Sequence, residues 1–204
     1  MKPRIRQLLL DFDGVLARYD HRRRLAYLAT HAGCEPARVD AALFASGLEA
    51  EYDSGRVDTG GYLERLGGAL ACRVDHEAWA AARLAGTVAD AQALACLDAV
   101  DASVALGVLT NNGALMQDLI PRIVAPLSAR LVDTVLVSGT LGMRKPDPRV
   151  FERALGLLGW DARSTLFIDD TFANVQGARK AGLHADTAGD ARALRRVLVR
   201  YRLA

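Results

Sequence analysis

The sequence predicts an α/β protein in which a parallel β-sheet is covered by helices on both faces and interrupted by a helical insertion. Short apolar runs of strand length alternate with helix-length segments, a pattern that favours a parallel sheet. These runs lie at 5–10, 104–109, 132–137, 165–168 and, more weakly, 183–186. The region from about Arg18 to Gly86 has no convincing strand and shows consecutive amphipathic segments instead, which predicts a helical bundle inserted after the first strand.

Helices are expected between the later strands. The stretch 113–127 carries apolar residues at helical spacing. In the stretch 146–159, Asp147 and Pro148 are typical of a helix start, and the glycines at its end are typical of a stop. A shorter helix over 174–181 is expected to end at Gly182.

Composition predicts a soluble globular protein and argues against a disordered or a membrane protein. Of its 204 residues, 51% are hydrophobic and 25% are charged, with a net charge of +2. No stretch approaches a charge-free spanning length, and the first apolar run is too short and too closely flanked by acids for a signal peptide. A cytoplasmic location is therefore expected.

Two basic stretches resemble nucleic-acid or membrane patches, namely residues 21–24 and the final residues 192–204. In the second, apolar residues recur at helical spacing, which is typical of a packed helix with a solvated basic face. Aromatic residues are few and are not interleaved with the basic ones. We therefore expect neither a nucleic-acid nor a membrane partner.

Polar side chains follow each central strand at the point where the strand ends. They are Asp11 and Asp13 after the first, Thr110, Asn111 and Asn112 after the second, Lys145 after the third, and Asp169, Asp170 and Asn174 after the fourth. Loops at the carboxyl ends of parallel strands converge on one ligand site. Clustered carboxylates favour Mg²⁺, and a lysine with hydroxyl and amide donors suits a phosphoryl group. Each pattern alone is also typical of a turn or a helix cap, but together they favour a site.

The motifs "DFDGVL", "LTNN", "RKPDP" and "FIDDTFANVQGARKAG" resemble, in order, the four motifs of the haloacid dehalogenase (HAD) superfamily. The resemblance spans nearly the whole chain. It implies a Rossmann-like parallel-sheet core over residues 1–16 and 87–204 and an inserted α-helical cap of type 1 over residues 17–86. The closing "DDxxxN" pattern is similar to the branch containing sugar-1-phosphate phosphatases, the phosphatase domain of epoxide hydrolases and 2-haloacid dehalogenases.

The resemblance implies hydrolysis of a small phosphorylated metabolite, with a sugar phosphate as the expected substrate, through an aspartyl phosphate. Asp11 would be the nucleophile, and Asp13 would protonate the leaving oxygen and then deprotonate water. Lys145 would offset the charge of Asp11 and of the phosphate. Thr110, the Asn111 backbone and Lys145 would hold the phosphate oxygens.

The same resemblance implies Mg²⁺ as the cofactor. Asp11, Asp170 and the carbonyl of Asp13 would bind it, with Asp169 as an auxiliary ligand. Asn174 stands where many relatives have an aspartate, so we expect it to orient Lys145 or the groups around the metal.

Within the insertion, "YDSGR" lies between two expected helices, and its Tyr52 and Arg56 are candidates for selecting the substrate, although a plain turn would look the same. The alternative functions are a phosphoglucomutase-like phosphoryl transferase, a 2-haloacid dehalogenase and a non-catalytic regulatory protein with this fold. Asp13 argues against the dehalogenase, because a departing halide needs no proton and an alkoxide does.

Overall fold

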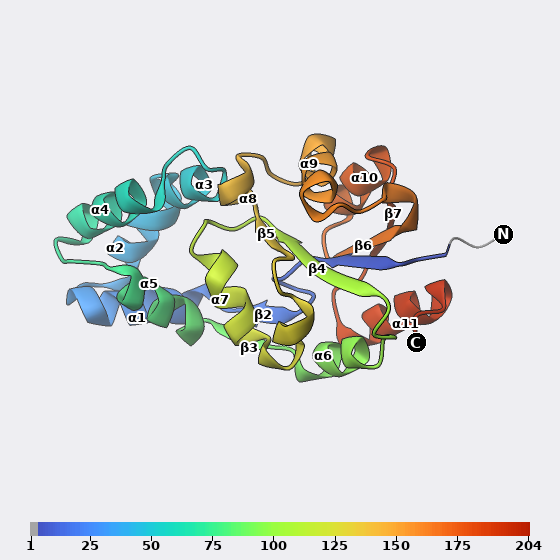
Figure 1. Ribbon diagram of the computed structural model, residues 1–204. Coiled ribbons are helices and arrows are strands. Elements are labelled where there is room, and N and C mark those ends of the chain that lie inside the picture. Colours follow the sequence, from blue (N-terminus) through green and yellow to red (C-terminus); the bar gives the residue numbers. More distant parts are fainter. Residues whose placement is uncertain (1–3) are drawn as a thin grey trace.

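The computed structural model describes residues 4–204, within which a five-stranded parallel sheet forms the centre of the molecule (Figure 1). The strand order is β5-β4-β1-β6-β7. The strands are β1 Gln7–Leu10, β4 Ala105–Thr110, β5 Val135–Val137, β6 Thr165–Asp169 and β7 His184–Thr187. The expected α/β class is confirmed, and each expected apolar run overlaps one of these strands.

The central strand β1 fixes where the polar loops meet. It pairs with β4 on one side and with β6 on the other, and Leu10 aligns with Val108 and with Ile168. The three strands run parallel, so the segments that follow them leave the same edge of the sheet. This register brings the loops that carry Asp11, Asn111 and Asp170 together.

Side chains alternate between the two faces of β1, as a buried parallel strand requires. Leu8 and Leu10 belong to the apolar cluster that also contains residues of α6 Ala91–Asp98, α7 Met116–Ile123 and α11 Ala191–Tyr201. Leu9 belongs to the opposite cluster, with residues of α9 Pro148–Leu158 and α10 Phe172–Lys180. The sheet is therefore covered by helices on both faces.

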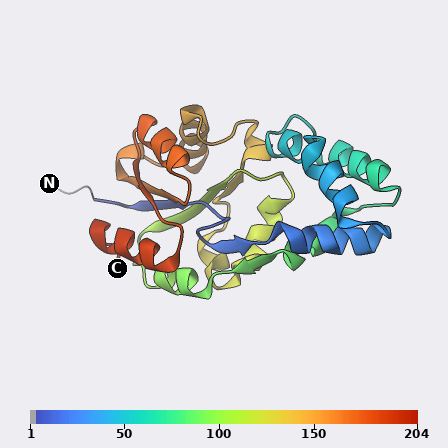
Figure 2. The ribbon, with the colours of Figure 1, turned by 180° about the vertical axis from the view of Figure 1, so that it is seen from behind.

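A group of helices, here called the helical insertion (residues 21–85), lies beyond the carboxyl edge of the sheet (Figures 1 and 2). Its helices are α1 His21–Ala32, α2 Pro36–Asp40 with a following π-helical turn Ala41–Ala45, α3 Leu48–Asp53, α4 Thr59–Leu70 and α5 His76–Ala85. Asp20, Asp58 and Asp75 each accept a backbone hydrogen bond at the start of a helix, as good N-caps do. The limits 17–86 for a separate domain stay a prediction, and residues 1–3 of the expected core lie outside the described residues.

The expectation of no strand between Arg18 and Gly86 is wrong at its edge. Residues Ala17–Tyr19 form β2, which pairs in antiparallel fashion with β3, Thr87–Ala89, so that a short ribbon joins the insertion to the sheet. Each strand is three residues long and its partner is distant in sequence, so no local pattern marks it. The backbone N–H of Asp20 extends the pairing by donating to Gly86 O at 2.7 Å.

The remaining differences concern the ends of elements. The helix expected over 113–127 is the shorter α7, which contains Pro121 and is followed by a 3₁₀ segment, Ala125–Arg130. Proline removes a helical hydrogen bond, which accounts for the early end. The strand expected from residue 132 begins only at Val135. Short elements α8 Ser138–Leu141 and the 3₁₀ turn Ala162–Ser164 complete the fold.

A buried polar network holds the helices of the insertion together. The guanidinium of Arg24 on α1 contacts both carboxylate oxygens of Glu49 on α3 and also donates to the Tyr62 hydroxyl at 3.0 Å. Tyr62 donates to Glu49 at 2.6 Å, and the Trp79 indole lies 3.3 Å from the same hydroxyl. Because the Arg24 side chain is 2% exposed, its loss would leave Glu49 without its cation in a site that excludes water.

Replacing Arg24 with methionine is expected to lower the free energy of unfolding by about 3 kcal/mol or more, since breaking a buried ion pair leaves a charge uncompensated. The matched control is Arg65→Met, which removes the Arg65–Glu51 pair whose side chains are 49% and 36% exposed. That change should cost about 0.5 kcal/mol or less. Urea unfolding of both variants measures the difference, and equal losses would contradict a special role for Arg24.

Candidate active site

A buried lysine lies between two carboxylates at the carboxyl edge of the sheet. Lys145 Nζ is 2.9 Å from Asp11 Oδ1 and 2.6 Å from Asp169 Oδ2. Asp11 follows β1 and Asp169 ends β6, so the parallel pairing of these strands places the two acids side by side. The side chains of Lys145 and Asp169 are 1% and 0% exposed. The expected association of Asp11 with Lys145 is present.

The electrostatics of this cluster follow from burial. Loss of water raises the pKa of Asp11 to about 7, and the nearby charge of Asp169 acts in the same direction, while Lys145 opposes both. The backbone N–H of Phe12 also donates to Asp11 Oδ1, at 2.7 Å. Asp11 therefore depends on nearby cations to stay ionised at neutral pH.

The backbone of Lys145 is held by Asn111. The Asn111 side chain donates to Lys145 O at 2.9 Å and accepts from Lys145 N at 2.9 Å. Thus the side chain of Asn111 positions the lysine, in addition to the phosphate contact expected from its backbone. Asn174 acts from the other side, because its amide donates to both oxygens of Asp169 at 3.1 Å.

The carboxylates of Asp11, Asp169 and Asp170 are arranged so that one oxygen of each lies within 4.8 Å of the others. Such hard oxygen donors fit a Mg²⁺ ion. Asp169 already accepts from Lys145, Asn174 and the backbone of Thr171, whereas Asp170 is exposed and accepts from the Thr171 hydroxyl at 3.1 Å. Asp11 and Asp170 are thus the better placed to hold a cation. The pKa of Asp170 is also raised, chiefly because its carboxyl, although exposed, is partly removed from water.

Gly14 allows the loop after β1 to approach Asp170. Its φ is +88°, and a Cβ built on it would lie 2.4 Å from Asp170 Oδ2. A side chain at this position would be strained and would displace the carboxylate. The "DG" pair in the first motif therefore serves the close approach of two strand-end loops.

Thr110 and Asp13 are joined through Asn112, a residue that follows the second strand. The Asn112 amide donates to Thr110 Oγ1 at 2.9 Å and to Asp13 Oδ2 at 3.1 Å. Thr110 is 1% exposed, and in this contact its hydroxyl is the acceptor. Its own proton therefore remains to be donated, and within residues 4–204 no acceptor for it is present.

Sequence reasoning did not identify Arg83, which reaches the site from the last turn of α5. Its guanidinium donates to Asp13 Oδ2 at 2.7 Å, although its side chain is 3% exposed. A signal was available, because Arg83 lies one turn after Trp79 on the buried stripe of an amphipathic helix. An arginine on such a stripe needs a buried partner.

The two residues suggested for substrate selection lie in different settings. Tyr52 is 2% exposed, and its hydroxyl lies 3.0 Å from Thr59 Oγ1 and accepts from Leu115 N at 3.0 Å. Its ring also packs against Gly113, so the contacts of Tyr52 join the insertion to the sheet loops. Arg56 is exposed. A role for either in substrate selection stays a prediction.

Asp53, at the end of α3, is a further acid at the junction between the insertion and the sheet. Its backbone carbonyl accepts a hydrogen bond from Ser138, which follows β5. Burial raises the pKa of its carboxyl to about 7, with Glu49 adding to the rise and Arg144, Arg24 and Arg83 opposing it. It is thus a carboxyl that is partly removed from water at the junction between insertion and sheet.

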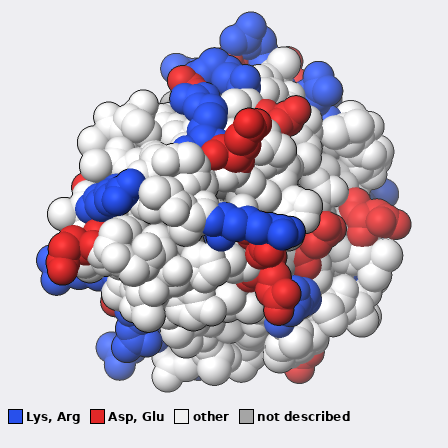
Figure 3. Space-filling model, turned by 90° about the vertical axis from the view of Figure 1, so that its left-hand side faces the viewer, with Lys and Arg blue, Asp and Glu red and all other residues white. Residues whose placement is uncertain are grey.

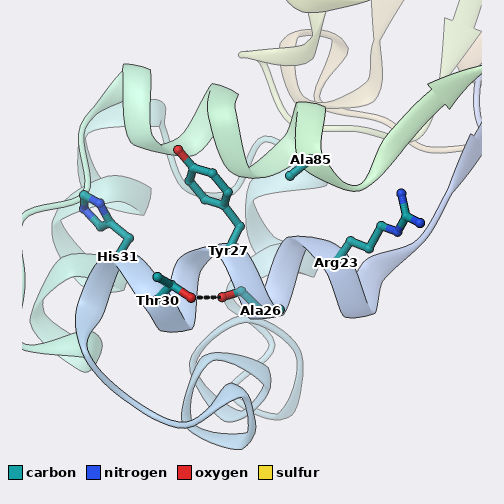
Figure 4. A pocket seen from close by; sticks show the side chains of 6 residues that line it. All are labelled: Arg23, Ala26, Tyr27, Thr30, His31 and Ala85. Atoms are coloured by element: carbon teal, nitrogen blue, oxygen red, sulfur yellow. Dashed lines mark hydrogen bonds between the residues drawn. The ribbon is translucent and has the colours of Figure 1, made fainter.

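A hollow of about 550 Å³ lies away from these groups, between α1 and α5 (Figure 4). Its lining is Arg23, Ala26, Tyr27, Thr30, His31 and Ala85, and the Thr30 hydroxyl is already bonded to Ala26 O at 3.0 Å. It has no carboxylate in this lining. The chemistry-bearing groups gather at the sheet edge instead.

The surface shows mixed charge. On the face at the end of the helical insertion, acidic and basic side chains are interspersed (Figure 3). Within the described part of the chain, residues 4–204, every helix is too short or too polar to cross a bilayer.

The fold and this cluster define a class of protein: a Rossmann-like α/β protein with helices inserted beside an aspartate–lysine site. The family model for haloacid dehalogenase-like hydrolases matches residues 5–182, and the chain belongs to that family. A curated relative, Phosphatase MT3486 of Mycobacterium tuberculosis, is 42% identical over 90 residues, which are 43% of this chain and 41% of that protein. The match thus spans about two fifths of its length.

Solved structures agree in fold. A predicted HAD-like family hydrolase from Porphyromonas gingivalis has a TM-score of 0.72 at 24% identity, covering 90% of both chains. A HAD family enzyme from Bacteroides thetaiotaomicron, in complex with magnesium and inorganic phosphate, has a TM-score of 0.72 at 19% identity, covering 90% of this chain and 93% of that one.

The pKa of Asp53 generates a prediction about stability. Because the folded value of about 7 lies above the ordinary 3.8, the folded protein holds this proton more tightly than the unfolded chain does. The resulting stability is complete below the ordinary value and is lost as the pH rises through about 7. Asp53→Asn should therefore flatten the fall in unfolding free energy between pH 4 and 7.5, by up to about 4 kcal/mol.

Urea unfolding at several pH values, on wild type and Asp53→Asn in the same buffers, measures this difference. The difference between the two curves isolates Asp53 from the other titrating groups. Parallel curves would show that Asp53 ionises in the folded protein as it does in the unfolded chain.

Proposed function

We propose that this protein is a Mg²⁺-dependent phosphomonoester hydrolase that acts on a small phosphorylated metabolite, with sugar phosphates as the first class to test. The observation that carries the proposal is the contact of Lys145 with the buried Asp11 beside the exposed Asp170. An anionic nucleophile meets a phosphate dianion only where cations offset both charges. The phosphatase name of the Mycobacterium tuberculosis relative and the phosphate complex of the Bacteroides thetaiotaomicron enzyme support this choice.

In the proposed reaction, an oxygen of Asp11 attacks phosphorus and the bond from phosphorus to the ester oxygen breaks. Asp13 gives its proton to that leaving oxygen, so the alcohol departs neutral. Asp13 then takes a proton from the water that attacks the aspartyl phosphate, which releases inorganic phosphate and restores Asp11. Thr110 and the Asn111 backbone would hold the phosphate oxygens, while Lys145 offsets the charge of Asp11.

For the metal, Asp11, Asp170 and the Asp13 carbonyl would hold Mg²⁺, with Asp169 as an auxiliary group. The ion would supply positive charge to the phosphate oxygens. Asn174 would act indirectly, since its amide fixes Asp169 and Asp169 in turn holds the Lys145 ammonium.

A screen of phosphorylated metabolites with phosphate release as the readout tests the proposal. Activity should vanish in EDTA and return when Mg²⁺ is added in excess, because Asp11 and Asp170 repel each other and the phosphate without the cation. Asp11→Asn serves as the inactive control. Full turnover in chelator would refute the metal requirement, and halide release from 2-chloropropionate by the wild type would refute the phosphatase assignment.

The role of Asp13 predicts a dependence on the leaving group. Asp13→Asn should slow the first step with glycerol 2-phosphate by about 10² or more, the scale of lost general acid catalysis. With p-nitrophenyl phosphate, whose leaving group needs little protonation, that step should slow by about threefold or less. Single-turnover measurements isolate the step. Equal losses on both substrates would exclude Asp13 as the leaving-group acid.

A further inference from the structure

The carboxylate of Asp13 is bonded very unequally at its two oxygens. Oδ2 accepts from Arg83 at 2.7 Å and from Asn112 at 3.1 Å. Oδ1 is buried and has no hydrogen-bond partner among residues 4–204. Burying a carboxylate oxygen without a hydrogen-bond donor costs free energy. Its presence at this site therefore indicates that Oδ1 interacts with a group outside the chain, such as a substrate or water.

Arg83 is itself held in one orientation by groups from separate elements. Its Nε donates to Met116 Sδ on α7 at 3.2 Å, and its Nη2 also donates to Asn112 Oδ1 at 3.1 Å. The guanidinium lies 3.9 Å from the centre of the Tyr19 ring on β2, a cation–π contact. With so many contacts, Arg83 leaves Asp13 little freedom to rotate.

We infer that Arg83 is a positioning residue: together with Asn112 it holds Asp13 Oδ2, so that Asp13 Oδ1 is the atom that gives and takes the proton. The inference rests on the proposed phosphatase function, because it assigns an atom to the acid step of that reaction. In the forward step the proton on Oδ1 passes to the ester oxygen as the bond to phosphorus breaks. In the second step Oδ1 receives a proton from the attacking water.

The position of Arg83 in the fold gives this contact a second property. Arg83 lies in the last turn of α5, and its backbone carbonyl accepts from the Thr87 hydroxyl at 2.7 Å at the start of β3. Asp13 and Asn112 lie on loops of the sheet. The acid is therefore oriented by a side chain of the insertion, and it is fully oriented only while the insertion is seated on the sheet.

The test is a double-mutant cycle between Arg83 and Asp13, using glycerol 2-phosphate and p-nitrophenyl phosphate as probes in single-turnover experiments with Mg²⁺. Arg83→Met should slow the first step with glycerol 2-phosphate by about 10-fold to 10²-fold, a part of what general acid catalysis supplies. With p-nitrophenyl phosphate the loss should be about threefold or less. In the Asp13→Asn background, Arg83→Met should have no further effect on the rate, because the carboxyl group that Arg83 positions is already absent.

Two further variants separate positioning from folding. Arg83→Lys should recover part of the rate, because an ammonium can reach Oδ2 but cannot also contact Met116 and Asn112. Arg65→Met removes another ion pair of the insertion and should leave both rates unchanged. If Arg83→Met fails to fold, as judged by circular dichroism and thermal unfolding, the cycle is run with Arg83→Lys, for which a smaller loss with the same selectivity is expected.

The outcomes distinguish the inference from the proposed function. If the wild type releases no phosphate from either probe or from the metabolite screen, the proposed function is wrong and the inference falls with it. If the wild type turns over both probes, the inference alone is overturned by equal losses on the two substrates, or by an Arg83 effect that persists in the Asp13→Asn background. A persistent effect would mean that Arg83 acts on the substrate directly.

Discussion

The contact of the Lys145 ammonium with Asp11 and Asp169 is the constraint on which the rest of this structure depends. Two carboxylates buried side by side would repel each other, and their proximity is tolerable because one cation lies against both. Much of the surrounding structure serves to keep that cation in place. Asn111 clamps its backbone from the loop after β4, and Asn174 fixes Asp169 from α10. Burial thus strengthens the attraction of Lys145 for the two carboxylates as well as the repulsion between the carboxylates.

The helical insertion covers this cluster at the carboxyl edge of the sheet. Its internal order comes from the Arg24–Glu49–Tyr62 network, and its attachment to the sheet comes from polar contacts at the junction. Tyr52 accepts from Leu115 in one such contact, and Arg83 donates to Asp13 in another. The insertion is therefore bound to the sheet through groups beside the acid that is proposed to carry the proton. Packing of the insertion and orientation of the acid are linked.

The parts of this architecture that depend on local sequence could be predicted. Apolar runs located every strand of the central sheet, because strands buried on both faces leave a continuous signal, and polar residues at their ends located Asp11, Lys145 and Asp170. Contacts between distant segments could not be found in this way. The β2–β3 ribbon joins residues from the two ends of the insertion, and Arg83 meets Asp13 only after the helices have packed. Asn112 was visible beside Asn111, but its bridging contacts depend on the folded loop.

The pairing of β2 with β3 determines how the fold tolerates changes in the length of the insertion. Both ends of the insertion leave the sheet through one ribbon, with Ala17 aligned to Ala89 and Asp20 bonded to Gly86. To the sheet, the whole insertion is a closed loop with adjacent ends, and the entropy of closing a loop grows only slowly with its length. The length of the insertion therefore has little effect on the free energy of forming the central sheet. A chain so connected is free to lengthen, shorten or exchange this segment while the order of its central strands stays the same.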